Sequence, residues 1–340
     1  MVTDGKLVYT MGYDKAKGID IVWCFDALTG EEVWTHSYEA EIMDRAHEGG
    51  TVNTPSIDGD VLHVLNREGK LYCLERQTGE VRWFTMLLPE DNPHGLERPT
   101  WGFSGSPLVL EDELILNCGK ILSVDKSSGE VRWASRDYGH AYCTPITFEH
   151  EGRPVLAILN GDGVAVLSRA DGSEIAFQAF TGETLGINAP TPVLVGQSSL
   201  FISSGPRDGN ALFALEDGEL REVWANKEMI NSFSGCVLVG EHLYGYHRSL
   251  LRCITKEGEE CWSVRGTGNG AVSAAGDRIL AMTSDGELIV CKADPEEYEV
   301  LLRTPVFDDG GRYWTKPVIA NGVVYCRSSR GGLVARDHRQ

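Results

Sequence analysis

Hydrophobic and polar positions alternate along this chain in short runs that are separated by turn signals. Between residues 54 and 85, apolar runs at 61–65, 71–74 and 81–84 are interrupted by Asp58-Gly59, Arg67-Glu68-Gly69 and Gln77-Thr78-Gly79-Glu80. Four short strands joined by tight turns form an antiparallel meander. No segment keeps a sustained helical period, so the pattern predicts an all-β chain.

The same four-strand unit recurs around a Thr-Gly-Glu turn that is followed by tryptophan. Clear copies span residues 23–34, 72–83 and 122–133, and degenerate copies follow at 165–177, 213–224, 252–262, 289–301 and 333–337. One inner position of the repeat falls at Cys24, Cys73, Ser123, Val166, Ala214, Cys253, Cys291 and Ala335, at intervals of 38 to 50 residues. A period of that length is typical of one propeller blade.

We therefore predict an eight-bladed β-propeller of four-stranded antiparallel blades, forming one domain over residues 1–340. The eighth copy ends after three strands, so the last blade is expected to be incomplete. The expected blades are approximately 1–40, 51–88, 104–138, 142–180, 190–227, 234–266, 270–306 and 314–340.

The conspicuous residues of the repeat are interpreted as structural. A large ring on the outer strand fills the wedge between neighbouring blades, and a glycine in the preceding turn supplies a positive φ. The expected docking tryptophans are Trp34, Trp83, Trp133, Trp224 and Trp262. The expected turn glycines are Gly30, Gly79, Gly129, Gly172 and Gly258.

This repeat resembles that of the pyrroloquinoline-quinone (PQQ) propellers over nearly the whole chain. Two groups share it: quinoprotein alcohol dehydrogenases, and PQQ-like proteins such as the lipoprotein of the outer-membrane β-barrel assembly machine. Residues 48–50, 101–107 and 325–329 resemble compact PQQ-like repeat proteins of environmental bacteria. The resemblance implies a periplasmic or secreted protein that binds another protein or an envelope component.

The quinone chemistry of the dehydrogenases does not follow from this resemblance. Those enzymes are longer and hold the quinone against a disulfide between adjacent cysteines, whereas no two of the nine cysteines here are adjacent. No local motif matches their Ca²⁺-binding residues. We therefore expect no cofactor, and we consider dependence on PQQ and Ca²⁺ improbable.

The two ends of the chain bear on how such a propeller is completed. In the family, an N-terminal segment supplies the outer strand of the last blade and the inner strand of the first. The first copy here begins near its second strand, at residues 7–10, so both strands are expected to be absent. An unpaired edge predicts a weak seam between the first and last blades, and natural upstream sequence is expected to raise the melting temperature.

Charge and composition narrow the range of partners. The formal charge of -19 argues against nucleic acid, which needs a basic face. No apolar run is long enough to span a bilayer, and residues 1–5 do not begin a signal peptide. The cysteines show no C-x-x-C spacing, so no metal site is expected. The sequence leaves open whether Cys253 and Cys261 form a disulfide.

One set of residues is a candidate ligand site. Positions just before each innermost strand are expected to surround a mouth of the central channel, and they mix aromatic and amide side chains. Such a set suits a planar or sugar-like ligand, although the same residues could simply plug the channel. They are Asn53, Trp101, Phe103, His140, Tyr142, Asn188, Asn231, Phe233, Asn269, Tyr313 and Trp314. The flanking loops carry Arg45, His47, Glu48, Arg98 and Arg312.

Two catalytic motifs match only formally. Residues 266–270 are glycine-rich but precede a strand, whereas a phosphate cradle requires a helix N-terminus. Ser123 and Lys126 fit S-x-x-K but lie inside the repeat. A non-catalytic binding scaffold is therefore the leading hypothesis. A carbohydrate-binding or hydrolytic protein using the channel mouth is the alternative, and a quinoprotein dehydrogenase ranks third.

Overall fold

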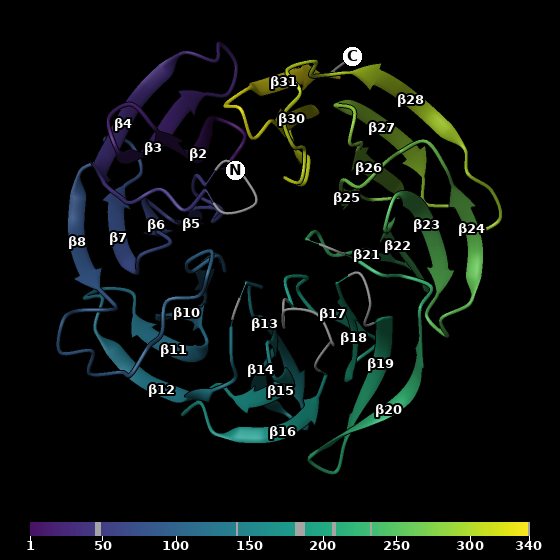
Figure 1. The fold of residues 1–340 in the computed structure, drawn as a ribbon, viewed down its shortest axis with the longest axis horizontal. Coiled ribbons are helices and arrows are strands. Elements are labelled where there is room, and N and C mark those ends of the chain that lie inside the picture. Colours follow the sequence, from purple (N-terminus) through teal and green to yellow (C-terminus); the bar gives the residue numbers. More distant parts are fainter. Residues whose placement is uncertain (45–48, 141, 181–187, 206–208, 232, 339–340) are drawn as a thin grey trace. The chain divides into compact units, whose positions relative to one another are not determined.

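The computed structural model describes residues 1–44, 49–140, 142–180, 188–205, 209–231 and 233–338. Within these ranges every regular element is a β-strand, and the strands form eight antiparallel sheets (Figure 1). Seven sheets have four strands and the last has three. The predicted fold, an eight-bladed β-propeller with an incomplete last blade, is confirmed.

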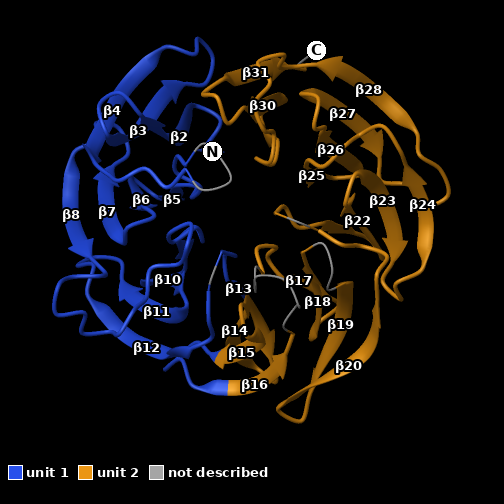
Figure 2. Ribbon diagram, viewed as in Figure 1, with its two compact units in different colours: residues 1–146, 168–174 blue, residues 147–167, 175–340 orange. Residues whose placement is uncertain are grey.

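The chain divides into two compact units, which are described separately below. One comprises residues 1–146 and 168–174, and the other comprises residues 147–167 and 175–340 (Figure 2). We call them unit 1 and unit 2.

Unit 1 contains the first three sheets. The first sheet is β1 (Val2–Thr3), β2 (Leu7–Asp14), β3 (Ile19–Asp26) and β4 (Glu32–Glu39). The second is β5 (Ser56–Asp58), β6 (Val61–Leu65), β7 (Lys70–Glu75) and β8 (Val81–Met86). The third is β9 (Leu108–Val109), β10 (Glu113–Cys118), β11 (Lys120–Asp125) and β12 (Val131–Asp137).

Unit 2 contains most of the fourth sheet and the four that follow. The fourth sheet is β13 (Ile146–His150), β14 (Arg153–Asn160), β15 (Gly163–Ser168) and β16 (Glu174–Ala179). The fifth is β17 (Val193–Val195), β18 (Ser199–Ser204), β19 (Gly209–Glu216) and β20 (Glu219–Asn226). The sixth is β21 (Val237–Val239), β22 (His242–His247), β23 (Leu250–Thr255) and β24 (Glu260–Val264). The seventh is β25 (Ala271–Ala275), β26 (Arg278–Met282), β27 (Glu287–Lys292) and β28 (Val300–Pro305). The eighth has three strands, β29 (Val318–Ala320), β30 (Val323–Arg327) and β31 (Leu333–Asp337).

The first sheet corrects one expectation from the sequence. We predicted that its inner strand would be absent, but Val2 pairs with Tyr9 and Thr3 pairs with Val8. Two residues are enough because the inner strands of this protein are short, and β9 is also only two residues long. A strand of two residues has no alternation that a sequence pattern could reveal.

The repeat residues before the tryptophan build a capped turn. In the first sheet, Asp26 Oδ1 accepts the backbone amides of Leu28 and Thr29, both at 2.8 Å. Gly30 follows in the left-handed region at φ 72°, where glycine carries no Cβ penalty. The pairing register then shifts between Cys24 and Phe25. The motif therefore encodes a turn and a β-bulge that together place the tryptophan.

Each of these tryptophans packs on the next sheet. Trp34 Nε1 donates to the carbonyl of Arg76 at 3.0 Å, and a Cβ added to Gly79 would lie 2.5 Å from the Trp34 ring. The indole therefore occupies space that only a glycine turn leaves free. The same donor contact joins Trp83 to Lys126 O (3.1 Å), Trp224 to Lys256 O (3.0 Å) and Trp262 to Asp294 O (2.8 Å). The same close ring approach occurs at Gly129, Gly172 and Gly258, which face Trp83, Trp133 and Trp224.

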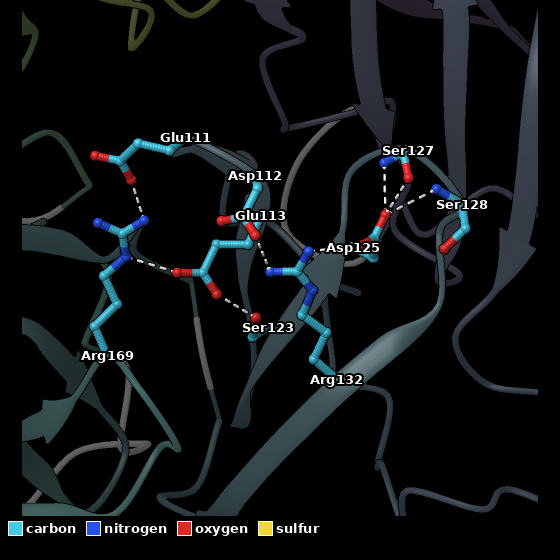
Figure 3. Close-up of polar contacts among 9 residues, drawn as sticks. All are labelled: Glu111, Asp112, Glu113, Ser123, Asp125, Ser127, Ser128, Arg132 and Arg169. Atoms are coloured by element: carbon cyan, nitrogen blue, oxygen red, sulfur yellow. Dashed lines mark hydrogen bonds and ion pairs between the residues drawn. The ribbon is translucent and has the colours of Figure 1, made fainter.

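Within unit 1, Arg169 joins the turn at residues 168–174 to the third sheet (Figure 3). Arg169 Nε donates to Glu113 Oε1 at 2.6 Å, and its guanidinium also pairs with Glu111. The Ser123 hydroxyl donates to the other oxygen of Glu113. Lys126 instead pairs with Asp58 at 2.9 Å. Ser123 and Lys126 therefore serve separate ion-pair networks, in agreement with reading the S-x-x-K match as chance.

Candidate functional site

The asparagines expected at the channel mouth hold main chain in place. Asn53, Asn188 and Asn231 are each at most 3% exposed. Their amide groups donate to the carbonyls of Gly105 (3.0 Å), Asn160 (2.6 Å) and Tyr246 (2.9 Å), respectively. A buried amide that binds a backbone carbonyl fixes a loop to a strand end. These three side chains position the loops, and the Oδ1 atoms of Asn53 and Asn231 accept no hydrogen bond from the described residues.

The aromatic residues of unit 1 in this set comprise one buried ring, Phe103, and two half-buried rings, Trp101 and Tyr142. Phe103 is fully buried in a core cluster with Leu65 and Leu87, and one ring carbon lies 3.2 Å from the Cβ position of Gly69. Trp101 and Tyr142 meet edge to face at 5.7 Å between ring centroids. Burial raises the pKa of Tyr142 to about 12. His140 is exposed and lies at the same end of the sheet.

Tyr313 of unit 2 likewise belongs to the core. It is 3% exposed, and its ring stacks on Phe307 at 5.4 Å with an interplanar angle of 6°. Its hydroxyl donates to Asp309 Oδ1 at 2.7 Å. These contacts anchor the segment between β28 and β29, from which the next residue, Trp314, projects.

Phe233 and Trp314 form an accessible aromatic surface on unit 2. Their rings stack at 4.4 Å between centroids with an interplanar angle of 28°, although they belong to segments that precede β21 and β29. Phe233 is 49% exposed and Trp314 is half-buried. The guanidinium carbon of Arg312 lies 5.0 Å from the Trp314 ring centroid, a cation–π contact. We call Phe233, Trp314 and Arg312 the aromatic platform.

Two hydrogen bonds to Ser329 hold the backbone of Arg312 in place, and a second cation, Lys316, follows Trp314 in the sequence. The Arg312 amide donates to Ser329 Oγ at 2.8 Å, and the Ser329 amide donates to the Arg312 carbonyl at 3.0 Å. Lys316, two residues beyond Trp314, is exposed to solvent. Asn269, also predicted at the mouth, is half-buried before β25. The platform therefore offers ring faces beside positive charge.

Sequence reasoning missed Lys316, although a signal for it exists. In several blades a hydroxyl residue precedes the proline of the inner strand, as in Thr54-Pro55, Ser106-Pro107 and Thr144-Pro145. Ser106 Oγ accepts the amide of Thr54 at 3.0 Å, so the hydroxyl residue links neighbouring blades. Lys316-Pro317 places a cation at the corresponding position. The replacement of the usual hydroxyl residue by lysine at position 316 is therefore the sequence signal that singles out this blade.

Of the flanking-loop residues, Arg312 belongs to the aromatic platform and Arg98 forms a surface contact. Arg98 lies 3.6 Å from Glu41 in an exposed ion pair, a type of contact that contributes little free energy. Arg45, His47 and Glu48 lie outside the described residues.

The thiols and acidic residues do not fit a quinone or metal site. Cys253 and Cys261, whose pairing the sequence left open, are both free thiols in contact with each other, and burial raises the pKa of Cys253. Within the described ranges, no three His, Cys, Asp or Glu side chains gather as metal ligands. The sequence also has no adjacent cysteines, the feature by which the resemblance would point to a quinone site.

Comparisons with solved structures place the fold among known propellers. BamB from Moraxella catarrhalis aligns with a TM-score of 0.67 at 19% identity, covering 98% of this chain and 95% of that one. The designed protein Ika8 aligns with a TM-score of 0.65 at 14% identity, covering 98% and 97%. A quinohemoprotein alcohol dehydrogenase from Comamonas testosteroni aligns with a TM-score of 0.64 at 14% identity, covering 94% of this chain and 72% of its own. At such identities these likenesses establish the fold alone.

The sequence itself carries the family assignment. No curated protein matches it. In the described part of the chain, no helix has the length and hydrophobicity needed to cross a bilayer. The family model for the outer membrane protein assembly factor BamB, a PQQ-repeat family, matches residues 19–263. The resemblance to the PQQ-like propellers is therefore confirmed, and this chain belongs to the BamB family.

Proposed function

We propose that this protein is a non-catalytic binding propeller of the bacterial cell envelope that docks a protein through the aromatic platform. The observation that carries the proposal is the stack of Phe233 on Trp314, which is accessible although most other predicted mouth residues are buried. Large accessible aromatic side chains with an adjacent arginine are the residue types that dominate binding energy at protein interfaces.

The chemistry around the platform favours an acidic partner segment. Arg312 and Lys316 lie within two residues of Trp314, so an aromatic side chain could stack while a neighbouring carboxylate pairs with either cation. A carbohydrate could also stack on these rings, but a neutral sugar carries no charge that would interact with the positive charge beside them. We therefore favour a protein over the alternative of a sugar-binding or hydrolytic enzyme, and the proposal involves no PQQ or Ca²⁺.

The family match supports a location in the cell envelope and a protein as the partner. The matching family is named for outer membrane protein assembly, which is consistent with a periplasmic protein that contacts other proteins. The formal charge of -19 disfavours nucleic acid as the partner.

Site-specific photocrosslinking in the native host tests this proposal. A photoreactive phenylalanine analogue replaces Phe233, and in a matched control it replaces Val223, an exposed apolar residue on the outer strand β20. We expect one discrete protein adduct at position 233 and none at 223. Adducts that are absent, or identical at both positions, would contradict the proposal.

A further inference from the structure

Unit 2 also contains a cavity that shares no lining residue with the platform. Its volume is about 640 Å³, and it lies where the β22–β23 hairpin, the loop before β25 and the β26–β27 turn meet. The lining includes His247, Arg248, Leu250, Arg265, Ser284 and Asp285. This volume is within the range of small-molecule sites, ~300–1,000 Å³.

The charge of this cavity is opposite to that of the whole chain. Arg248 and Arg265 face a single carboxylate, Asp285, in a protein of formal charge -19. Asp285 already accepts the Ser284 hydroxyl at 3.2 Å. Among the described residues, no ion pair or hydrogen bond engages the exposed Arg265 side chain. The Arg265 guanidinium is therefore available to an incoming anion, and Arg248 adds a second positive charge to the wall.

Arg248 occupies a backbone position that is costly for arginine. It lies at φ 54° in the two-residue turn that joins His247 to Leu250, in the left-handed region that hairpin turns usually fill with glycine or asparagine. Glu151, Asp217 and Asn321 share this conformation, but each is followed by glycine, whereas Arg248 is followed by Ser249. Strain of this kind is a reason to look for a function of the side chain that is retained.

The other walls of the cavity are formed by His247 and by the close approach of Gly268 to Ser284. The Ile230 amide donates to His247 Nδ1 at 3.4 Å, which leaves Nε2 as the protonated nitrogen. Burial, with Arg252 and Arg248 nearby, lowers the pKa of His247, so the ring is neutral at neutral pH. A Cβ at Gly268 would lie 1.7 Å from Ser284 Oγ, so only glycine lets these two walls approach. The cavity is thus a preformed pocket with two cationic donors.

We propose that this pocket binds a small molecule through a carboxylate or phosphate group held by Arg248 and Arg265. The two guanidinium groups pair with the oxyanion, the serine hydroxyls and the imidazole face its polar remainder, and Leu250 supplies an apolar contact. This site is independent of the aromatic platform, and neither proposal depends on the other.

Isothermal titration calorimetry of the full chain with inorganic phosphate and with citrate, at low ionic strength, tests the proposal. We expect saturable binding of at least one of them with a Kd of about 1 mM or tighter. Arg265→Gln is expected to weaken binding by about 10-fold or more, the scale of one lost charge-assisted hydrogen bond. Arg221→Gln, at an exposed arginine on β20 that pairs with Glu216, is the matched control and should bind as the native chain does.

Arg248→Gly separates binding from folding. Glycine relieves the positive φ, so the variant is expected to melt at the same or a higher temperature while binding the anion about 10-fold more weakly. Binding of phosphate alone, of citrate alone or of both identifies the preferred anion and supports the site. Failure of both anions to bind, or undiminished binding in both arginine variants, would overturn the proposal.

Discussion

Phe103 of unit 1 and Phe233 of unit 2 occupy similar sequence contexts, just before an inner strand, but have opposite environments. Phe103 is fully buried among leucines, whereas Phe233 is 49% exposed and contacts the face of Trp314. The difference arises from the neighbours. Gly69 and Leu87 leave a space that Phe103 fills, whereas about half of the Phe233 surface stays open to solvent. Position in the repeat therefore does not determine whether an aromatic residue supports the fold or is available for binding.

The largest effect should distinguish these two phenylalanines by stability. Phe103→Ala is expected to lower the free energy of unfolding by about 3–5 kcal/mol, because it removes a ring from a close-packed core. Phe233→Ala should change it by less than about 1 kcal/mol, since the ring is half exposed. Denaturant unfolding of both variants measures this contrast, and equal losses would show that the platform is also part of the core.

A buried carboxylate makes unit 1 sensitive to pH. Asp20 is fully buried, lies 3.6 Å from Arg67, and neither of its oxygens accepts a hydrogen bond from the described residues. Desolvation raises its pKa to about 6, from 3.8. A raised folded-state pKa favours the folded state at low pH, and this contribution is lost as the pH rises through about 6.

Asp20→Asn tests this pH dependence. The stability of the native chain relative to this variant should fall by up to about 3 kcal/mol between pH 4 and pH 6.5. Unfolding measured across this range in both proteins isolates Asp20 from the other carboxyl groups. A constant difference between the two proteins would contradict the assignment.

Substituting the turn glycines should destabilise unit 1 and unit 2 in the same way, because both units pack a tryptophan ring against such a turn. Gly79→Ala and Gly258→Ala each place a Cβ within 3 Å of a tryptophan ring or a neighbouring amide, whereas Gly30→Ala meets nothing within 4 Å. All three glycines have a positive φ, so each variant pays about 1–2 kcal/mol for the backbone. The first two should lose a further ~1–3 kcal/mol through overpacking. Equal losses at all three positions, seen in thermal unfolding, would show that the docking contact is not tight.

These contrasts also separate what the sequence predicts from what it does not. Asp26, Gly30 and Trp34 act within one turn and one neighbouring blade, so their spacing is enough to predict blades and their number. The two-residue strand at Val2–Thr3 has no pattern to detect. Burial of Asn53 or exposure of Phe233 depends on loops from other blades, and a sequence does not show which loops meet.

The central claim is that the aromatic platform binds a partner while the buried mouth residues hold the fold. Trp314→Ala, combined with the photocrosslinker at position 233, tests it most directly. The account predicts that the melting temperature stays within a few degrees of the native value and that the protein adduct disappears. An adduct that persists without Trp314, or one that is lost only together with the fold, would contradict the account.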